Sequence, residues 1–249
     1  MQGVFDLDGP APCPDTQGVT LEDCISMRFA PLFVLPLLAA ACSAHALSID
    51  FGNGPSEPTI CSDTPDGLGA LVPCSTFAYL SQSYGDVAGV SDITYSAPRV
   101  PGHSLEWWNT NYNTLYGVAF AEGGDSNSRA RIEIKAVTTG TLVTLSAFDL
   151  GAYSNTTHGT TVNIYAIGGG VPLYTFVGNV GNSSNEPTHF AVNVSAVGGL
   201  WIEFQDNAYN VGIDNIQYAV ATVPEPASVG LMLAGLLGIG ALSTARRRG

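Results

Sequence analysis

The amino-acid sequence predicts an all-β fold in which antiparallel strands pack as a β-sandwich. Apolar residues recur at every second position in several segments, and clusters of turn-forming residues separate those segments. The spacing of these turn clusters is typical of sandwich domains; they lie at residues 123–124, 139–140, 154–155, 168–170, 178–185 and 198–199. No stretch of sequence between them has the period of an amphipathic helix.

The strands can be justified in chain order. In residues 131–136, isoleucine and alanine alternate with arginine, glutamate and lysine, which predicts a strand with one buried face. Residues 141–150 have apolar side chains at both odd and even positions, which predicts a central strand buried on both faces. Residues 161–166 and 190–195 return to a period of two, so we expect two further half-buried strands.

Two more segments complete the predicted sandwich, at residues 201–204 and in the closing VGIDNI sequence at residues 211–216. This order of strands resembles the jelly-roll β-sandwich of exported bacterial proteins and of galactose-binding-like modules. The resemblance implies a fold. It implies no particular function, because such sandwiches serve many.

The C-terminal residues join three features in a fixed order. The tripeptide Pro224, Glu225 and Pro226 precedes residues 227–245, which contain no Asp, Glu, Lys or Arg. At about 1.5 Å rise per residue, a helix of that length crosses the hydrocarbon core of a bilayer once. Three basic residues follow, which the positive-inside rule places on the cytoplasmic side, with the preceding chain outside: Arg246, Arg247 and Arg248.

Residues 223–249, beginning with Val223, resemble the PEP-CTERM sorting signal of Gram-negative bacteria. The resemblance implies export and transient anchoring in the inner membrane, with the domain on the periplasmic side. It also implies an exosortase as partner, a membrane protease that cuts near the tripeptide. The final location would then be the cell surface or the extracellular matrix, in a bacterium that makes exopolysaccharide.

A secretory signal peptide is predicted at residues 27–46. Arg28 precedes an apolar run, and the small residues Ala44 and Ala46 follow it. We therefore expect passage through the secretory translocon and cleavage by signal peptidase after Ala46.

Two other interpretations of this segment stay open. A buried helix is disfavoured by two prolines in the run, and a lipoprotein signal ending at Cys42 lacks the usual leucine spacing. Residues 1–26 are acidic, which is the wrong charge ahead of a signal peptide. We interpret them as a spurious extension upstream of a true start at Met27.

Residues 47–222 remain as one domain, long enough to bury a sizeable core. The whole chain has a formal net charge of -13. Such a chain repels phosphate backbones, which excludes nucleic acid as a partner. The domain contains only four basic residues: Arg99, Arg129, Arg131 and Lys135.

Cys61 and Cys74 are the two cysteines of this domain. In an oxidising compartment we expect a disulfide between them, which would close a turn-rich loop and contribute about 3 kcal/mol to stability. Two free thiols are the alternative. A redox or zinc role would need a closer pair or more ligands.

An aromatic cluster is the first candidate for ligand contact. Trp107, Trp108 and Tyr112 lie close together, with asparagines between them, a mixture suited to stacking against sugar rings and binding their hydroxyl groups. Adjacent residues on a strand point to opposite faces, so at most one of the two tryptophans can belong to a binding surface.

A structural calcium ion is the second candidate, although the sequence requires no cofactor. Asp149 and Asp214 fall near the ends of predicted strands, where carboxylate oxygens could serve as calcium ligands. We expect Asp214 to fasten the last strand to the loop after Asp149. The alternative is that such side chains cap turns by hydrogen bonding to the backbone.

The sequence therefore favours an exported surface or matrix protein with a structural or adhesive role beside exopolysaccharide. The first alternative is a carbohydrate-binding module for the organism's own polysaccharide. The second is a cryptic hydrolase, for which Asp92 and Glu106 could supply a carboxylate pair. No motif for a nucleophile or a catalytic metal is present, so we expect no enzymatic activity.

Overall fold

A computed structural model describes residues 44–223, apart from 53, 55, 125 and 126. The described residues form antiparallel strands and contain no helix, which confirms the predicted all-β sandwich. The strands are β1 (Ala44–Ile49), β2 (Cys61–Ser62), β3 (Leu71–Val72), β4 (Ala78–Leu80), β5 (Ser91–Ser96), β6 (Glu106–Trp108), β7 (Val118–Phe120), β8 (Arg129–Ala136), β9 (Thr141–Ala152), β10 (His158–Ala166), β11 (Tyr174–Val180), β12 (Thr188–Val197), β13 (Gly199–Gln205) and β14 (Val211–Thr222).

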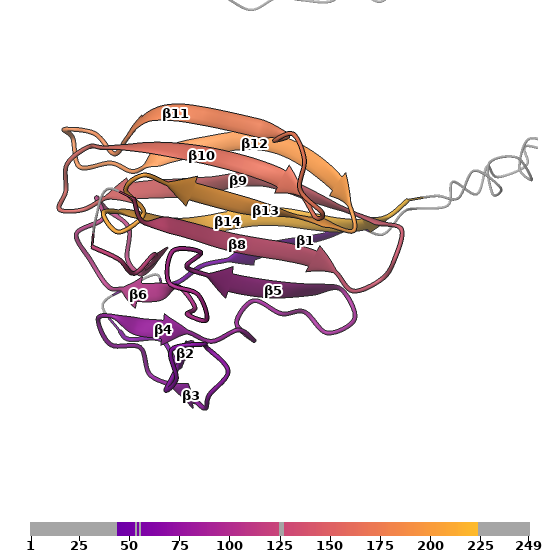
Figure 1. The fold of residues 1–249 in the computed structure, drawn as a ribbon, viewed down its shortest axis with the longest axis horizontal. Helices are drawn as coiled ribbons and strands as arrows, with labels where there is room; N and C mark the ends of the chain where they lie inside the picture. Colours follow the sequence, from indigo (N-terminus) through magenta and orange to yellow (C-terminus); the bar gives the residue numbers. More distant parts are fainter. Residues whose placement is uncertain (1–43, 53, 55, 125–126, 224–249) are drawn as a thin grey trace, which may run out of the picture. The chain divides into compact units, whose positions relative to one another are not determined.

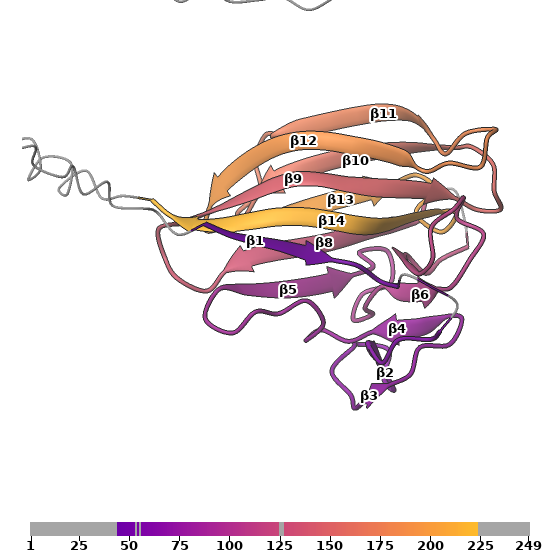
Figure 2. The ribbon, with the colours of Figure 1, turned by 180° about the vertical axis from the view of Figure 1, so that it is seen from behind.

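The strands form two sheets, which we call sheet A and sheet B. Sheet A has the order β12-β9-β14-β7-β6-β4-β2-β3, and β1 also pairs with β14. Sheet B has the order β11-β10-β13-β8-β5. Figure 1 looks onto sheet B, and Figure 2 shows the opposite side, where β1 lies beside β14.

The strand order is that of a jelly roll. The run β1-β14-β9-β12 in sheet A faces β8-β13-β10-β11 in sheet B, and successive strands from β8 to β10 and from β11 to β14 alternate between the sheets. Both views show β2, β3 and β4 as an extension beyond β6 (Figures 1 and 2).

The core lies between the two sheets and is filled by the side chains that point inward from alternate positions of each strand. Ile132 and Ile134 of β8 are fully buried, as are Val162 and Ile164 of β10. They belong to one hydrophobic cluster with Leu145 and other residues of sheet A. The half-buried strands predicted from the period-two pattern are therefore confirmed.

The prediction for residues 141–150 was right in position and wrong in burial. They lie in β9, which is central, between β12 and β14. Val143 and Leu145 face the core, but the alternate residues Leu142 and Thr144 are half-buried. The outer face of sheet A at this strand has no second layer over it among the described residues, so one face is packed and the other is only partly covered.

A disulfide joins Cys61 and Cys74, with Cα atoms 5.1 Å apart. Both cysteines are fully buried. The bridge ties β2 to the segment just before β4, in a part of the fold whose strands are only two or three residues long. Such short strands make few ladder hydrogen bonds, so the covalent bond carries much of the local stability.

The two ends of the described chain pair with each other. Ala44 lies opposite Ala221, and Ala46 lies opposite Ala219, in the β1–β14 ladder. Cleavage after Ala46, which the structure does not test, would leave residues 47–49 to pair with β14. The rest of the predicted signal peptide, the upstream extension and the tail from Pro224 onward, with its predicted membrane span at residues 227–245, lie outside the described residues. Within the described part of the chain, no helix is long and apolar enough to cross a bilayer.

Candidate functional site

Trp107 is a core residue and does not contact ligands, which corrects one of the predicted sugar contacts. It is 1 % exposed, and its indole Nε1 donates a hydrogen bond of 2.9 Å to the backbone carbonyl of Phe51. Its neighbours in β6, Glu106 and Trp108, point to the other face of the sheet, as strand alternation requires.

Tyr112 is also structural, which corrects a second predicted contact. It is 2 % exposed, and its hydroxyl donates to the backbone carbonyl of Tyr209 at 2.6 Å. Its ring packs against Tyr153 and Phe120, with centroids 5.4 Å and 6.0 Å away. Tyr112 therefore anchors the loop of residues 109–117 to the sandwich, and no sugar ring can reach its face.

Trp108 is half-buried and packs within an aromatic cluster. Phe77 and Tyr153 meet its ring in edge-to-face contacts, with centroids 4.8 Å and 5.4 Å away. The cavity beside it measures about 50 Å³ and is lined by five aromatic residues: Trp108, Tyr112, Phe120, Tyr153 and Tyr209. That volume admits a water molecule or two, so no sugar ring can enter the cavity itself. Trp108 stays partly exposed beside Phe77, which is 45 % exposed, so contact between Trp108 and a sugar stays a prediction.

A larger and more polar cavity of about 220 Å³ lies along the same loop. Its lining contains only amide, hydroxyl and apolar side chains: Thr110, Asn111, Asn113, Thr114, Leu115, Tyr116, Asn155 and Asn185. We call it the polar cavity. Tyr116 is 48 % exposed, which leaves much of its side chain open to solvent at this cavity.

The asparagines shape this cavity because they tolerate left-handed backbone. Asn111, Asn113, Asn155 and Asn185 have φ angles of 72°, 55°, 58° and 64°. Asn113 also fixes the loop to the end of β9: its Oδ1 accepts from the backbone N–H of Ala152 at 2.7 Å, and its Nδ2 donates to the carbonyl of Thr156 at 3.2 Å.

The polar cavity is lined by uncharged hydrogen-bonding groups. Oδ1 of Asn185 has no hydrogen-bond partner in the described structure, but this atom is shielded from solvent, so a ligand in the cavity would not reach it. The lining provides both donors and acceptors and carries no charge.

A separate group of titratable side chains lies on the outer face of β4, β6 and β7. One oxygen of Glu122, Oε2, accepts from the Tyr79 hydroxyl at 3.0 Å and lies 2.6 Å from Nδ1 of His103. Burial, followed by the negative charge of Glu122, raises the pKa of Glu106 to about 7. Burial and then the bond to Glu122 raise the pKa of Tyr79 to about 12.

This group does not supply the carboxylate pair considered from the sequence. Asp92 is exposed on β5 in sheet B, opposite Lys135, whereas Glu106 lies on β6 in sheet A. Glu106 is moreover 5 % exposed, so a polymer in solution has almost no access to it. The structure thus separates the two residues on which a glycosidase would depend.

Asp149 and Asp214 lie opposite each other in the β9–β14 ladder, and hydrogen bonds within the protein engage both. The two oxygens of Asp149 are engaged, by His189 Nδ1 at 2.7 Å and by Asn215 Nδ2 at 2.8 Å. Asp214 accepts from the backbone N–H of Phe51 at 2.9 Å. Among the described residues, no three His, Cys, Asp or Glu side chains come together as metal ligands. In this arrangement the side chains tie β1, β9, β12 and β14 together, and a calcium ion at Asp149 and Asp214 stays an untested prediction.

Fold and site together define an all-β sandwich protein with an uncharged polar cavity at one loop. The family described as PEP-CTERM protein-sorting motif matches residues 222–248, which confirms the resemblance read from the tail. The chain therefore carries an exosortase-recognised sorting motif, which marks it as an exported protein that is processed at the membrane.

Two further comparisons concern the domain. No curated protein matches the chain in sequence. Among solved structures, an exo-β-1,3-galactanase from Phanerochaete chrysosporium, solved with β-1,3-galactotriose, matches with a TM-score of 0.30 at 16 % identity. The match covers 60 % of this chain and 33 % of that one, so the matched region is a third of the galactanase chain.

Proposed function

We propose that the chain is a surface or matrix protein with an adhesive or structural role, which holds polysaccharide in the polar cavity and catalyses no reaction. The observation that carries the proposal is the uncharged lining of this cavity, which includes four asparagines and the exposed side chain of Tyr116. Sugars present many hydroxyl groups and apolar ring faces, which amide, hydroxyl and aromatic side chains bind.

The same lining supports binding without catalysis. Hydrolysis of a glycosidic bond calls for a pair of carboxyl groups, and the described lining of the polar cavity contains none. A carbohydrate-binding module and an adhesive protein share this chemistry, and they differ in where the protein acts. The sorting motif favours action at the cell surface, because exosortase substrates are exported.

The position of the motif supports this arrangement. β14 ends at Thr222, and the tripeptide begins at Pro224, so a single residue separates the last strand from the tripeptide of the sorting signal. While the tail is anchored, the domain would lie close to the periplasmic face of the inner membrane. Release or transfer by the exosortase would then move the polar cavity to the polysaccharide outside the cell.

The test compares Tyr116→Ala with a control of similar exposure, Leu173→Ala, where the side chain is 43 % exposed on another loop. Binding of the full-length protein to exopolysaccharide from its host would be measured by isothermal titration calorimetry. We expect Tyr116→Ala to weaken binding about fivefold, which corresponds to about 1 kcal/mol of lost ring contact, and Leu173→Ala to leave it unchanged. Equal affinities for both variants and the wild type would refute the role of the polar cavity.

A further inference from the structure

Strand β11 is the last strand of sheet B and has one free side. It pairs with β10, from His158 opposite Val180 to Ile164 opposite Tyr174, and no described strand lies on its other side. Both ribbon views show β11 at the margin of the fold (Figures 1 and 2). The backbone groups of alternate residues point to opposite sides of a strand, so every second residue of β11 directs its N–H and C=O groups away from β10.

Side chains cover the free edge at the other end of sheet B. On β5, the Ile93 N–H donates to the carboxylate of Asp86 at 2.7 Å. Gln82 binds both backbone groups of Tyr95: its Oε1 accepts from the N–H at 3.0 Å, and its Nε2 donates to the carbonyl at 2.8 Å. These bonds occupy backbone groups that a further strand would need, and the exposed Asp92 adds a charge to β5.

The edges of sheet A are short or irregular. β3 is two residues long, β12 is bulged between Ala191 and Val194, and the predicted cleavage after Ala46 would shorten β1 to three residues. β11 has none of these protections, because it is seven residues long and its pairing is unbroken. Among the described residues, its one side-chain hydrogen bond joins Thr175 to Asn163 and leaves the free backbone groups of β11 uncovered.

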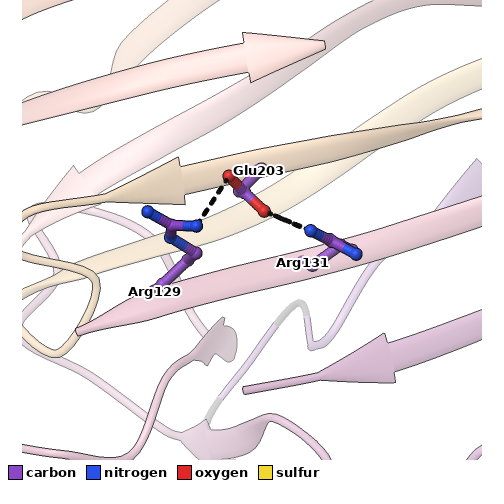
Figure 3. Close-up of polar contacts among 3 residues, drawn as sticks. All are labelled: Arg129, Arg131 and Glu203. Atoms are coloured by element: carbon purple, nitrogen blue, oxygen red, sulfur yellow. Dashed lines mark hydrogen bonds and ion pairs between the residues drawn. The ribbon is translucent and has the colours of Figure 1, made fainter. Parts of the chain in front are cut away.

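The margin of the fold at β11 carries no formal charge. Residues 150–185 contain no Asp, Glu, Lys or Arg, and this run includes all of β10 and β11. The charges of sheet B lie on its other strands, and Figure 3 shows Arg129 and Arg131 of β8 on either side of Glu203 of β13. Two copies of a chain with net charge -13 repel each other, so they approach most easily where neither carries charge.

The sequence of β11 also suits pairing with itself. Val177 is 74 % exposed and is the middle residue of the strand. A two-fold axis through Val177 therefore pairs the whole strand, antiparallel, with β11 of a second copy. Val177 then lies opposite its own counterpart, and Thr175 lies opposite Asn179; all three side chains are exposed on the outer face of sheet B.

We propose that β11 is a dimerisation surface, at which a second copy of this chain adds its own β11 in antiparallel register. The two five-stranded sheets B then form one continuous sheet. Such a pair closes on itself, so assembly stops at two copies, and the small area of a strand junction makes the dimer weak. Each copy has a polar cavity, so a dimer would bind polysaccharide at two points; this advantage rests on the proposed function, whereas the pairing does not.

Sedimentation equilibrium of the full-length protein in detergent solution measures this association. We expect the wild type to form a dimer whose share rises with protein concentration. Val177→Lys places two positive charges opposite each other at the axis, so the dissociation constant of the dimer should rise at least about tenfold. Leu68→Lys is the matched control, because Leu68 is also 74 % exposed and the substitution adds the same charge, and it should leave the dissociation constant unchanged.

Charge reversal tests whether residue 177 meets its own counterpart. Val177→Asp alone should also weaken the dimer, whereas an equimolar mixture of Val177→Lys and Val177→Asp should associate more tightly than either variant by itself, because opposite charges then face each other. Thermal unfolding of each variant establishes that it folds. Tyr116→Ala should dimerise like the wild type, so failure of the polar cavity and failure of this surface are distinguishable. A wild type that stays monomeric, equal effects of Val177→Lys and Leu68→Lys, or a mixture no tighter than its components would overturn the proposal.

Discussion

Asp214 lies directly opposite Asp149 in the β9–β14 ladder, yet the two carboxyl groups have different surroundings. Asp149 is partly open to solvent and bonded to His189 and Asn215, whereas Asp214 is 2 % exposed. Burial raises the pKa of Asp214 to about 8, against the hydrogen bond from Phe51 that lowers it. Near neutral pH this buried carboxyl group therefore holds its proton.

Asp214 should make the protein less stable as pH rises. The folded state binds this proton more tightly than the unfolded chain, so its contribution is fully present below pH 3.8 and is lost as the pH rises toward about 8. Asp214→Asn keeps an acceptor for the Phe51 N–H and removes the ionisation. We expect it to raise the free energy of unfolding at pH 9 by up to about 6 kcal/mol and to have little effect at pH 4. Urea unfolding at both pH values checks this, and an equal effect at the two pH values would contradict it.

Ionisation of Glu106 should also make the protein less stable as pH rises, over a lower pH range than that of Asp214. Its pKa rises from 4.5 to about 7 on folding, so its contribution to stability declines between those two pH values. Its charged neighbour is Glu122, which is itself bonded to Tyr79 and His103. Glu106→Gln should raise the melting temperature at pH 8, by the equivalent of about 2 kcal/mol, but not at pH 4. The exposed Glu186→Gln serves as control and should change neither value.

Loss of the disulfide should destabilise the domain. The bridge joins cysteines 13 positions apart, and a loop of that size corresponds to about 3 kcal/mol in the chain-entropy account. We expect the double variant Cys61→Ala with Cys74→Ala to unfold at a lower urea concentration, and a reducing agent to lower the stability of the wild type but not of the variant. A reduced wild type as stable as the oxidised protein would argue against a structural role for this bond.

Trp107 should affect stability and leave ligand binding unchanged. Trp107→Phe removes the hydrogen bond to the Phe51 carbonyl and leaves unfilled volume in the core, which together cost about 2–3 kcal/mol. Its affinity for exopolysaccharide should equal that of the wild type under conditions in which both are folded. A weakened affinity with unchanged stability would indicate that Trp107 contacts the ligand.

The strands were predictable because their pattern is local. Period-two alternation placed Ile132 and Ile134 in the core, and the structure buries both. The bulges were not predictable: β14 bulges where Asn215 has a φ of 53°, and β12 where Asn193 has a φ of 49°, and no apolar pattern signals either change of register.

The candidate sites depended on distant contacts and were harder to predict. Alternation indicated that one of the adjacent tryptophans was internal, but only the structure shows that this residue is Trp107 and that Phe77 and Tyr153 pack against the half-buried Trp108. The partner of Arg131 lies 72 positions away in the chain. The sequence does signal a charged outer face on β8, because Arg129, Arg131, Glu133 and Lys135 occupy alternate positions there.

The claim that this is an exported, exosortase-processed surface protein is tested most directly by the intact mass of the protein in the membrane and extracellular fractions of its host. We expect an extracellular form that has lost its signal peptide and ends near Pro224–Pro226. If the only mature form were membrane-bound and still carried Arg246, Arg247 and Arg248, the tail would be a permanent anchor, and the proposed role outside the cell would be contradicted.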